Sequence, residues 1–205
     1  MPWTWIADML AHPFIQYAFL AGTGVAIACG LVGYFLVLRA QVFTADALSH
    51  VAFTGALAAL AVGLDARLGL YVLTIAFAVL MGWLGPRGRA DDVVIGGVFA
   101  WVLGLGVLFL SLYTSRRSGS NGSAGITVLF GSIFGLDGAR AWIALVVAFG
   151  VAAAVVLTWR PLLFATVDEG VAAARGLPVR AIGLGFLALT GVTAAEVGLQ
   201  IGGDR

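Results

Sequence analysis

The sequence contains no lysine, and charged residues of every kind are scarce. Only 10% of its residues are charged, against about 25% in an ordinary soluble domain. So few charges cannot cover a soluble globule with a wettable surface. P-loop ATPases hold phosphate with the lysine of Gly-x-x-x-x-Gly-Lys-Ser/Thr. Without a lysine, these 205 residues cannot form such a motor by themselves.

Cysteine and net charge are also limited, and each excludes a class of protein. The single cysteine, Cys29, rules out an internal disulfide and is expected to be a small buried hydrophobe. A net charge of +1 without a basic patch argues against a nucleic-acid partner. No cleaved signal peptide is expected, because the first residues lack positive charge and the first apolar run is too long.

Long apolar runs dominate what is present, since 61% of the residues are hydrophobic and 29 are glycine. A membrane-spanning helix needs about 20 apolar residues to cross about 30 Å of hydrocarbon. The sequence therefore predicts an all-α fold, a polytopic integral membrane helix bundle in which residues 1–205 form a single transmembrane domain. About six spans are expected: Phe14–Leu38, Asp46–Val62, Leu68–Leu84, Val93–Leu112, Ala141–Leu157 and Ile182–Gly202.

Two further segments fit neither a span nor a simple loop. Gly125–Leu136 is apolar but only about half a span long, which predicts a re-entrant or surface-lying segment. Val167–Gly176 has Asp168 and Glu169 where a helix would start, and it closes on an arginine followed by Gly176. These are helix start and stop signals, so a short docking helix outside the hydrocarbon is expected.

The arginines constrain the orientation weakly. With the N-terminus outside, one more arginine lies on the cytoplasmic side than on the other, in agreement with the positive-inside rule. This choice also puts the short docking helix in the cytoplasm. The cytoplasmic arginines are then Arg39, Arg87, Arg89, Arg160, Arg175 and Arg180.

Small residues predict one close helix contact. Gly96, Ala100 and Gly104 recur every four residues, on one face of their span. Such a stripe lets a neighbouring backbone approach closely. Chance occurrence in a glycine-rich span explains the spacing equally well.

Asp46 and His50 are the strongest candidates for chemistry. Residues four apart lie one turn above each other on the same helix face, so a carboxylate and an imidazole can converge there. Such ligands suit zinc or manganese, and ionisable groups within a span mark an ion or proton pathway by default. The alternative is a helix cap at Asp46 and an interhelical hydrogen bond at His50. Glu196 could be a third ligand or a proton site, but the favoured interpretation gives it neither role.

Several segments together resemble the zinc/manganese/iron ABC importer permeases of the ABC-3 family. The resemblance runs from about Pro13 to Gly202 and is carried by Phe35–Arg39, Asp46–Gly55, Ile95–Phe99, Gly104–Val107, Leu129–Gly135 and the Asp168–Gly176 segment.

The resemblance implies a permease that transports Zn²⁺ or Mn²⁺, with iron as a further option, across a bacterial cytoplasmic membrane. It implies a pair of permeases, driven by separate ATP-binding cassette ATPase subunits and supplied by an extracellular metal-binding lipoprotein. ATP would bind only to the partner, so the permease would not itself be an enzyme and would hold no permanent cofactor. Asp46 and His50 match the family's proposed metal-coordinating pair. Asp168, Glu169 and Gly176 match the segment that docks on the ATPase.

One departure from the family pattern keeps other interpretations open. Family members continue after the position of Gly202 with further apolar segments, which predicts that this chain is C-terminally truncated. A non-functional fragment is therefore one alternative. A self-sufficient secondary carrier or channel is another, although no internal repeat supports it. An intramembrane metalloenzyme would need a third ligand and a general base that the sequence does not display.

Overall fold

The computed structural model describes residues 11–85, 91–116 and 138–201. Within these ranges the secondary structure is entirely helical. The helices are α2 (Pro13–Leu38), α3 (Val42–Val62), α4 (Ala66–Leu84), α5 (Asp92–Arg116), α7 (Gly138–Leu157), α8 (Trp159–Val167), α9 (Glu169–Ala174) and α10 (Val179–Ile201). The expected re-entrant segment Gly125–Leu136 lies outside the described residues.

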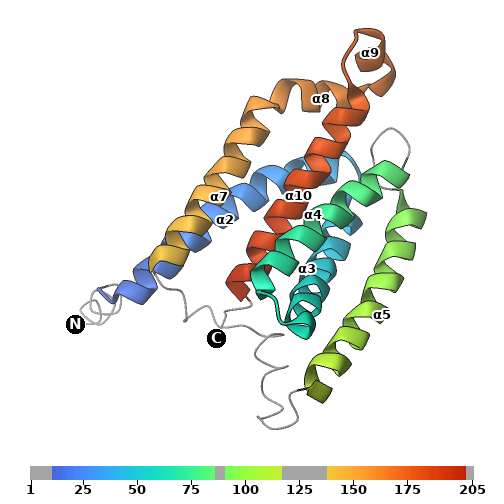
Figure 1. Ribbon diagram of the computed structural model, residues 1–205. Helices are drawn as coiled ribbons and strands as arrows, with labels where there is room; N and C mark the ends of the chain where they lie inside the picture. The colour runs from blue at the N-terminus through green and yellow to red at the C-terminus, as the bar shows by residue number, and fades with distance from the viewer. Residues whose placement is uncertain (1–10, 86–90, 117–137, 202–205) are drawn as a thin grey trace, which may run out of the picture.

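The helices confirm a polytopic membrane bundle with about six spans. Five of them (α2, α3, α4, α5 and α10) are long and apolar enough to cross a bilayer. A sixth span is obtained if α7 and α8 are counted together, and these two helices are bent by 59° where they meet. Figure 1 shows the long helices side by side, with α8 and α9 at one end of the bundle.

Local sequence signals explain where several helices begin and end. Pro13 opens α2 at a position that needs no backbone donor. The Asp65 carboxylate caps α4, accepting a 2.9 Å hydrogen bond from the amide of Arg67. At the end of α3, Gly63 adopts a φ of 87°, and Leu64 N donates to Ala59 O. This is the Schellman geometry, in which glycine takes the left-handed position without steric cost.

The interior consists of two main apolar cores. One contains residues of α2, α7 and α8, including Phe35, Val151 and Leu162. The other contains residues of α3, α4 and α5. Helix α10 contributes to both, because Phe186 packs in the first core and its neighbour Leu187 in the second. The bundle therefore has an α2–α7 side and an α3–α4–α5 side, with α10 between them.

The closest backbone contact joins α3 and α4. A Cβ atom added at Gly55 would lie 2.6 Å from the carbonyl oxygen of Gly69, so only glycine fits there. The stripe of Gly96, Ala100 and Gly104 does not behave as expected, because a Cβ at Gly96 or Gly104 would meet nothing within 4 Å. That face of α5 points away from the rest of the described chain, since α5 packs on α3 through its other side.

Helices α3 and α5 differ most in burial, which shows where the bundle is open. Of the most apolar stretch of each helix, 56% is buried in α3 and 17% in α5. Helix α3 contacts α2, α4, α5 and α10 and is the central helix. Helix α5 presents large apolar side chains such as Trp101 and Val107 outward, as expected for a surface in hydrocarbon.

Candidate translocation site and docking element

Asp46 and His50 both lie on α3, one turn apart, as the sequence predicts. Asp46 is in the second turn of the helix, and its side chain is exposed. His50 is half-buried, and its ring meets Phe99 of α5 edge-on with centroids 5.1 Å apart. The pair therefore stands at the α5 side of the central helix, open to the surroundings at Asp46.

Asp46 does not cap its helix, which removes one of the two simple structural explanations. Helix α3 begins at Val42 with Gln41 as the N-cap residue, and no side-chain cap is formed. The backbone carbonyl of Asp46 instead accepts a 2.7 Å hydrogen bond from Ser49 Oγ. The expected start of this span, at Asp46, was therefore four residues too late.

Asp46 and His50 do not find a third ligand within the described part of the chain. Among residues 11–85, 91–116 and 138–201, no three His, Cys, Asp or Glu side chains come together in a way that could hold a metal ion. Glu196 in particular does not join the pair. Two protein ligands are fewer than zinc or manganese usually takes. If the pair binds metal, its other ligands come from elsewhere.

Glu196 has a partner that the sequence did not reveal. Its side chain is 2% exposed on α10, and Oε2 accepts a hydrogen bond from the hydroxyl of Tyr71 on α4. The other oxygen, Oε1, is buried and has no hydrogen-bond partner among the residues that the structure describes. Because the partners are 125 residues apart, no local pattern could have indicated the pair. Glu196 therefore joins α4 to α10 inside the bundle.

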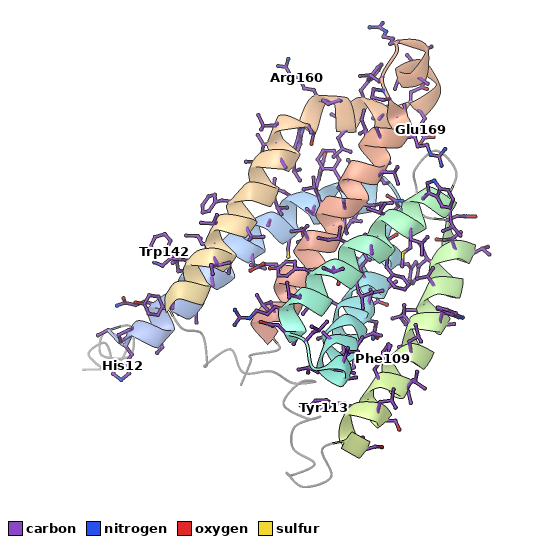
Figure 2. All side chains as sticks on the ribbon, in the orientation of Figure 1. His12, Phe109, Tyr113, Trp142, Arg160 and Glu169 are labelled. Carbon is purple, nitrogen blue, oxygen red and sulfur yellow. The ribbon has the colours of Figure 1, made fainter. Side chains whose placement is uncertain are left out.

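The short helix expected from Val167–Gly176 is present as α9. Asp168 is its N-cap, with Oδ1 accepting a 2.9 Å hydrogen bond from Val171 N. Gly176 follows the last turn with a φ of 80°, and Leu177 N donates to Ala172 O. Figure 2 places Glu169 at the same end of the bundle as Arg160 of α8, and His12 and Tyr113 at the opposite end. Helix α9 thus projects from one end of the spans (Figure 1).

Arg39 is unlike the other arginines at the α8–α9 end of the bundle. Its side chain is only 2% exposed, and the guanidinium carbon lies 5.3 Å from the ring centroid of Phe186. Arg160, Arg175 and Arg180 are all exposed. From the sequence, Arg39 was only one of the charges that set the orientation. Its ring partner Phe186 lies on α10, more than 140 residues further along the chain.

The apolar helices and the projecting α9 define a multi-pass membrane protein with a short polar element outside its spans. The sequence model of the ABC 3 transport family matches residues 11–203. The chain belongs to this family, and it is an integral protein of a bacterial cytoplasmic membrane.

Individual relatives agree with this assignment. The manganese transport system membrane protein MntC of Halalkalibacterium halodurans is 30% identical over 192 residues, which cover 93% of this chain and 64% of the relative. The chelated iron transport system membrane protein YfeD of Yersinia pestis is 28% identical over 189 residues, covering 92% and 62%. The chain thus spans somewhat less than two thirds of the length of these relatives.

A solved structure shows the same fold. The PsaBC complex of Streptococcus pneumoniae, determined with a Fab, superposes with a TM-score of 0.76 at 23% sequence identity. The match covers 98% of this chain and 71% of the other. At that identity the comparison supports the arrangement of the helices and not the choice of metal.

Proposed function

We propose that the chain is the permease subunit of an ATP-driven importer of divalent metal ions. The observation that carries the proposal is the Asp46–His50 pair on the central helix of a protein of this family. An acid and an imidazole within an apolar span are costly unless they serve an ion pathway. The names of the relatives, which transport manganese or chelated iron, support a transition-metal cargo.

A second copy of the chain is proposed to complete the metal path. Asp46 is exposed, so in a twofold symmetric pair it and His50 are free to face the same residues of the partner. Two carboxylates and two imidazoles would then give the four protein ligands that zinc commonly takes, and the carboxylates also suit manganese. Such a site would be shared between two copies and open to the translocation path. A transported metal ion could therefore both bind there and be released.

Helix α9 is proposed as the docking element for a separate ATPase subunit. It is short and polar at its start, and it projects beyond the spans. The chain has no lysine with which to build a P-loop of its own. In this proposal the ATPase moves α9, and the movement opens the path alternately to each side. An extracellular metal-binding lipoprotein delivers the cargo.

Uptake of radioactive Mn²⁺ and Zn²⁺ tests the metal path. The variants Asp46→Asn and His50→Ala are compared with Asp92→Asn and His12→Ala, which change an exposed aspartate at the start of α5 and a histidine at the edge of α2. We expect both path variants to lower uptake by about tenfold or more, because losing even an outer-shell partner of a metal ligand costs about that much. The control variants should transport normally at equal membrane abundance. Normal uptake by both path variants would exclude the pair from the path.

The docking role of α9 is tested by two substitutions at its N-cap. Asp168→Ser removes the charge but keeps a good cap, whereas Asp168→Ala removes both. If the folded helix is what the ATPase recognises, co-purification with the ATPase survives in the serine variant and falls in the alanine variant. Loss in both would assign the contact to the charge. Retention in both would contradict docking through this helix turn.

Blocking ATP hydrolysis on the partner separates an ATP-driven importer from a self-sufficient carrier. In vesicles that contain the permease with its ATPase, we expect uptake to stop when the ATPase is inactivated. Uptake that continues along an ion gradient without ATP hydrolysis would instead support a secondary carrier.

A further inference from the structure

Four aromatic rings join three helices at the end of the bundle that carries α9. We call this cluster the aromatic junction: Tyr34 and Phe35 of α2, Trp159 of α8 and Phe186 of α10. Trp159 stacks on Tyr34 with centroids 5.4 Å apart and meets Phe35 edge-on at 4.8 Å. Phe35 also meets Phe186 at 6.1 Å. Each such pair adds to simple burial, so the junction ties α2, α8 and α10 firmly together.

Arg39 is buried against this junction. Arginines at span ends usually extend toward water and headgroups, as the exposed Arg160, Arg175 and Arg180 do. Arg39 instead lies over the face of Phe186, where a desolvated cation gains from the ring quadrupole. A cation at the end of α2 also suits the helix dipole, but an exposed side chain would serve that purpose equally well. Burial against the ring of Phe186 is therefore the feature that sets Arg39 apart from these three arginines.

The aromatic junction connects the docking helix α9 on one side to the Asp46–His50 pair on the other. On one side, Trp159 is the first residue of α8, which leads directly into α9. On the other side, Arg39 ends α2 and is followed by the turn into α3, where Asp46 lies seven residues further on. Phe186 belongs to α10, the helix that contacts both apolar cores.

The turn between α2 and α3 is held by two backbone hydrogen bonds and contains a strained residue. Gln41 N donates to Leu36 O at 2.8 Å and Ala40 N donates to Val37 O at 3.1 Å, which is the Schellman arrangement. Ala40 occupies its left-handed position with a φ of 53°, although alanine is disfavoured there. A strained residue is retained only where its surroundings fix the conformation. A turn fixed in this way would carry a displacement of Arg39 to the start of α3.

We propose that Arg39, through its contact with Phe186, is a positioning residue that couples movement of α8–α9 to the Asp46–His50 pair. The inference rests on the proposed importer function. In this coupling, the ATPase displaces α9 and α8. The aromatic junction then moves α10 and the end of α2 together with α8. The contact of Arg39 with Phe186 determines how far the α2–α3 turn moves with them. Without the cation–ring contact, α9 still docks, but its movement is transmitted poorly to the metal path.

The test measures ATP hydrolysis and metal uptake in the same proteoliposomes. They contain the complete importer with this permease, its ATPase and its binding protein, and the probe is radioactive Mn²⁺ or Zn²⁺. Arg39→Met removes the charge and keeps a long side chain, and Arg39→Lys keeps a cation. Phe186→Leu removes the ring and keeps an apolar side chain. The matched controls are Arg160→Met, an exposed arginine next to Trp159, and Phe149→Leu, an outward-facing residue of α7.

We expect Arg39→Met and Phe186→Leu each to raise the ATP hydrolysed per metal ion by about tenfold, the scale of a lost buried cation–ring contact. The double variant should be no worse than either single variant, because both remove the same contact. Arg39→Lys should keep most of the coupling, since an ammonium also binds a ring face. Both controls should match the parent protein.

Other results would overturn the inference in distinguishable ways. If Arg39→Met lowers membrane abundance while uptake and hydrolysis per assembled importer stay normal, Arg39 is only structural. Additive effects of Arg39→Met and Phe186→Leu, or a lysine variant as uncoupled as the methionine variant, would contradict action through the ring contact. If Arg39→Met does not assemble, the ratio measured for Phe186→Leu decides the question. Absence of uptake by the parent importer would reject the proposed function itself, not this coupling route.

Discussion

Replacing Gly55 by alanine should destabilise the bundle because two helix backbones touch at this point. The new Cβ would lie 2.6 Å from the carbonyl oxygen of Gly69 on α4. Uncrowded non-bonded carbon contacts lie at about 3.5 Å or more. Helices α3 and α4 would therefore have to move apart by nearly the difference between this distance and 2.6 Å. Neither atom belongs to a flexible side chain, so neither can turn aside.

The size of the effect follows from overpacking in a tight interior. Small-to-large changes of this kind typically cost about 1–3 kcal/mol. For a globular chain of this length, each kcal/mol lowers the melting midpoint by about 2–4 °C. Gly55→Ala should therefore melt several degrees below the parent protein in a thermal unfolding assay of the detergent-purified chain.

Gly96→Ala provides the matched control for this prediction. The same methyl group is added in a long apolar helix, but a Cβ at Gly96 meets nothing within 4 Å. Alanine is the better helix former by about 1 kcal/mol, so this variant should melt no lower than the parent. Equal midpoints for Gly55→Ala and Gly96→Ala would show that the α3–α4 contact is looser than described, and would refute the reasoning.

Three further changes give expected results of known sign. Ala40→Gly should raise the melting midpoint, because glycine relieves a left-handed conformation that costs alanine about 1 kcal/mol. Asp168→Ala should increase protease cleavage near α9, since losing an N-cap costs about 1 kcal/mol, while Asp168→Ser should not. Tyr71→Phe should lower the melting midpoint, because it leaves the buried Glu196 carboxyl without its hydroxyl donor at a cost of about 1–3 kcal/mol. Adding Glu196→Leu to Tyr71→Phe should recover part of that loss, and no recovery would contradict this explanation.

The number and approximate limits of the spans were predictable, because a span imposes a length and a composition that are visible in a single sequence. The expected Leu68–Leu84 span corresponds to α4, which begins two residues earlier at Ala66. Helix α3 was the larger error, since its span was expected to start at Asp46, four residues after the observed start. The helix instead begins at Val42, with Gln41 as an N-cap residue that forms no side-chain cap.

The short helix α9 was predictable for a different reason. Its start and stop depend on local chemistry, the Asp168 carboxylate at one end and the left-handed Gly176 at the other. The backbone groups involved, Val171 N at the start and Ala172 O at the end, lie within four residues of Asp168 and Gly176. Such signals are readable from sequence because no distant part of the chain takes part in them.

Contacts between distant segments were not predictable. The sequence showed Glu196 as an isolated acid in a span and Arg39 as an ordinary arginine at a span end. Their partners, Tyr71 and Phe186, are supplied by the packing of α10 against α4 and α2. Gly55 and Gly69 likewise make their close contact through the crossing of α3 and α4, while the regular glycine stripe on α5 makes none within the described chain.

In the proposed importer, the two-core arrangement would restrict how this bundle alternates between two states. Helix α3 cannot bend readily at its centre, because Gly55 is pressed against the backbone of α4, and Thr54 Oγ1 donates to Val102 O of α5. Helices α2 and α7 share a separate core, and both also pack on α10, which in turn packs on α3 and α4. The low-cost movement is therefore a displacement of one side relative to the other, about α10. Asp46 and His50 lie on the central helix of one side, so such a displacement carries them as a fixed pair and changes what faces them. A metal ion would then be released by the loss of ligands from outside this helix, and not by separation of Asp46 from His50.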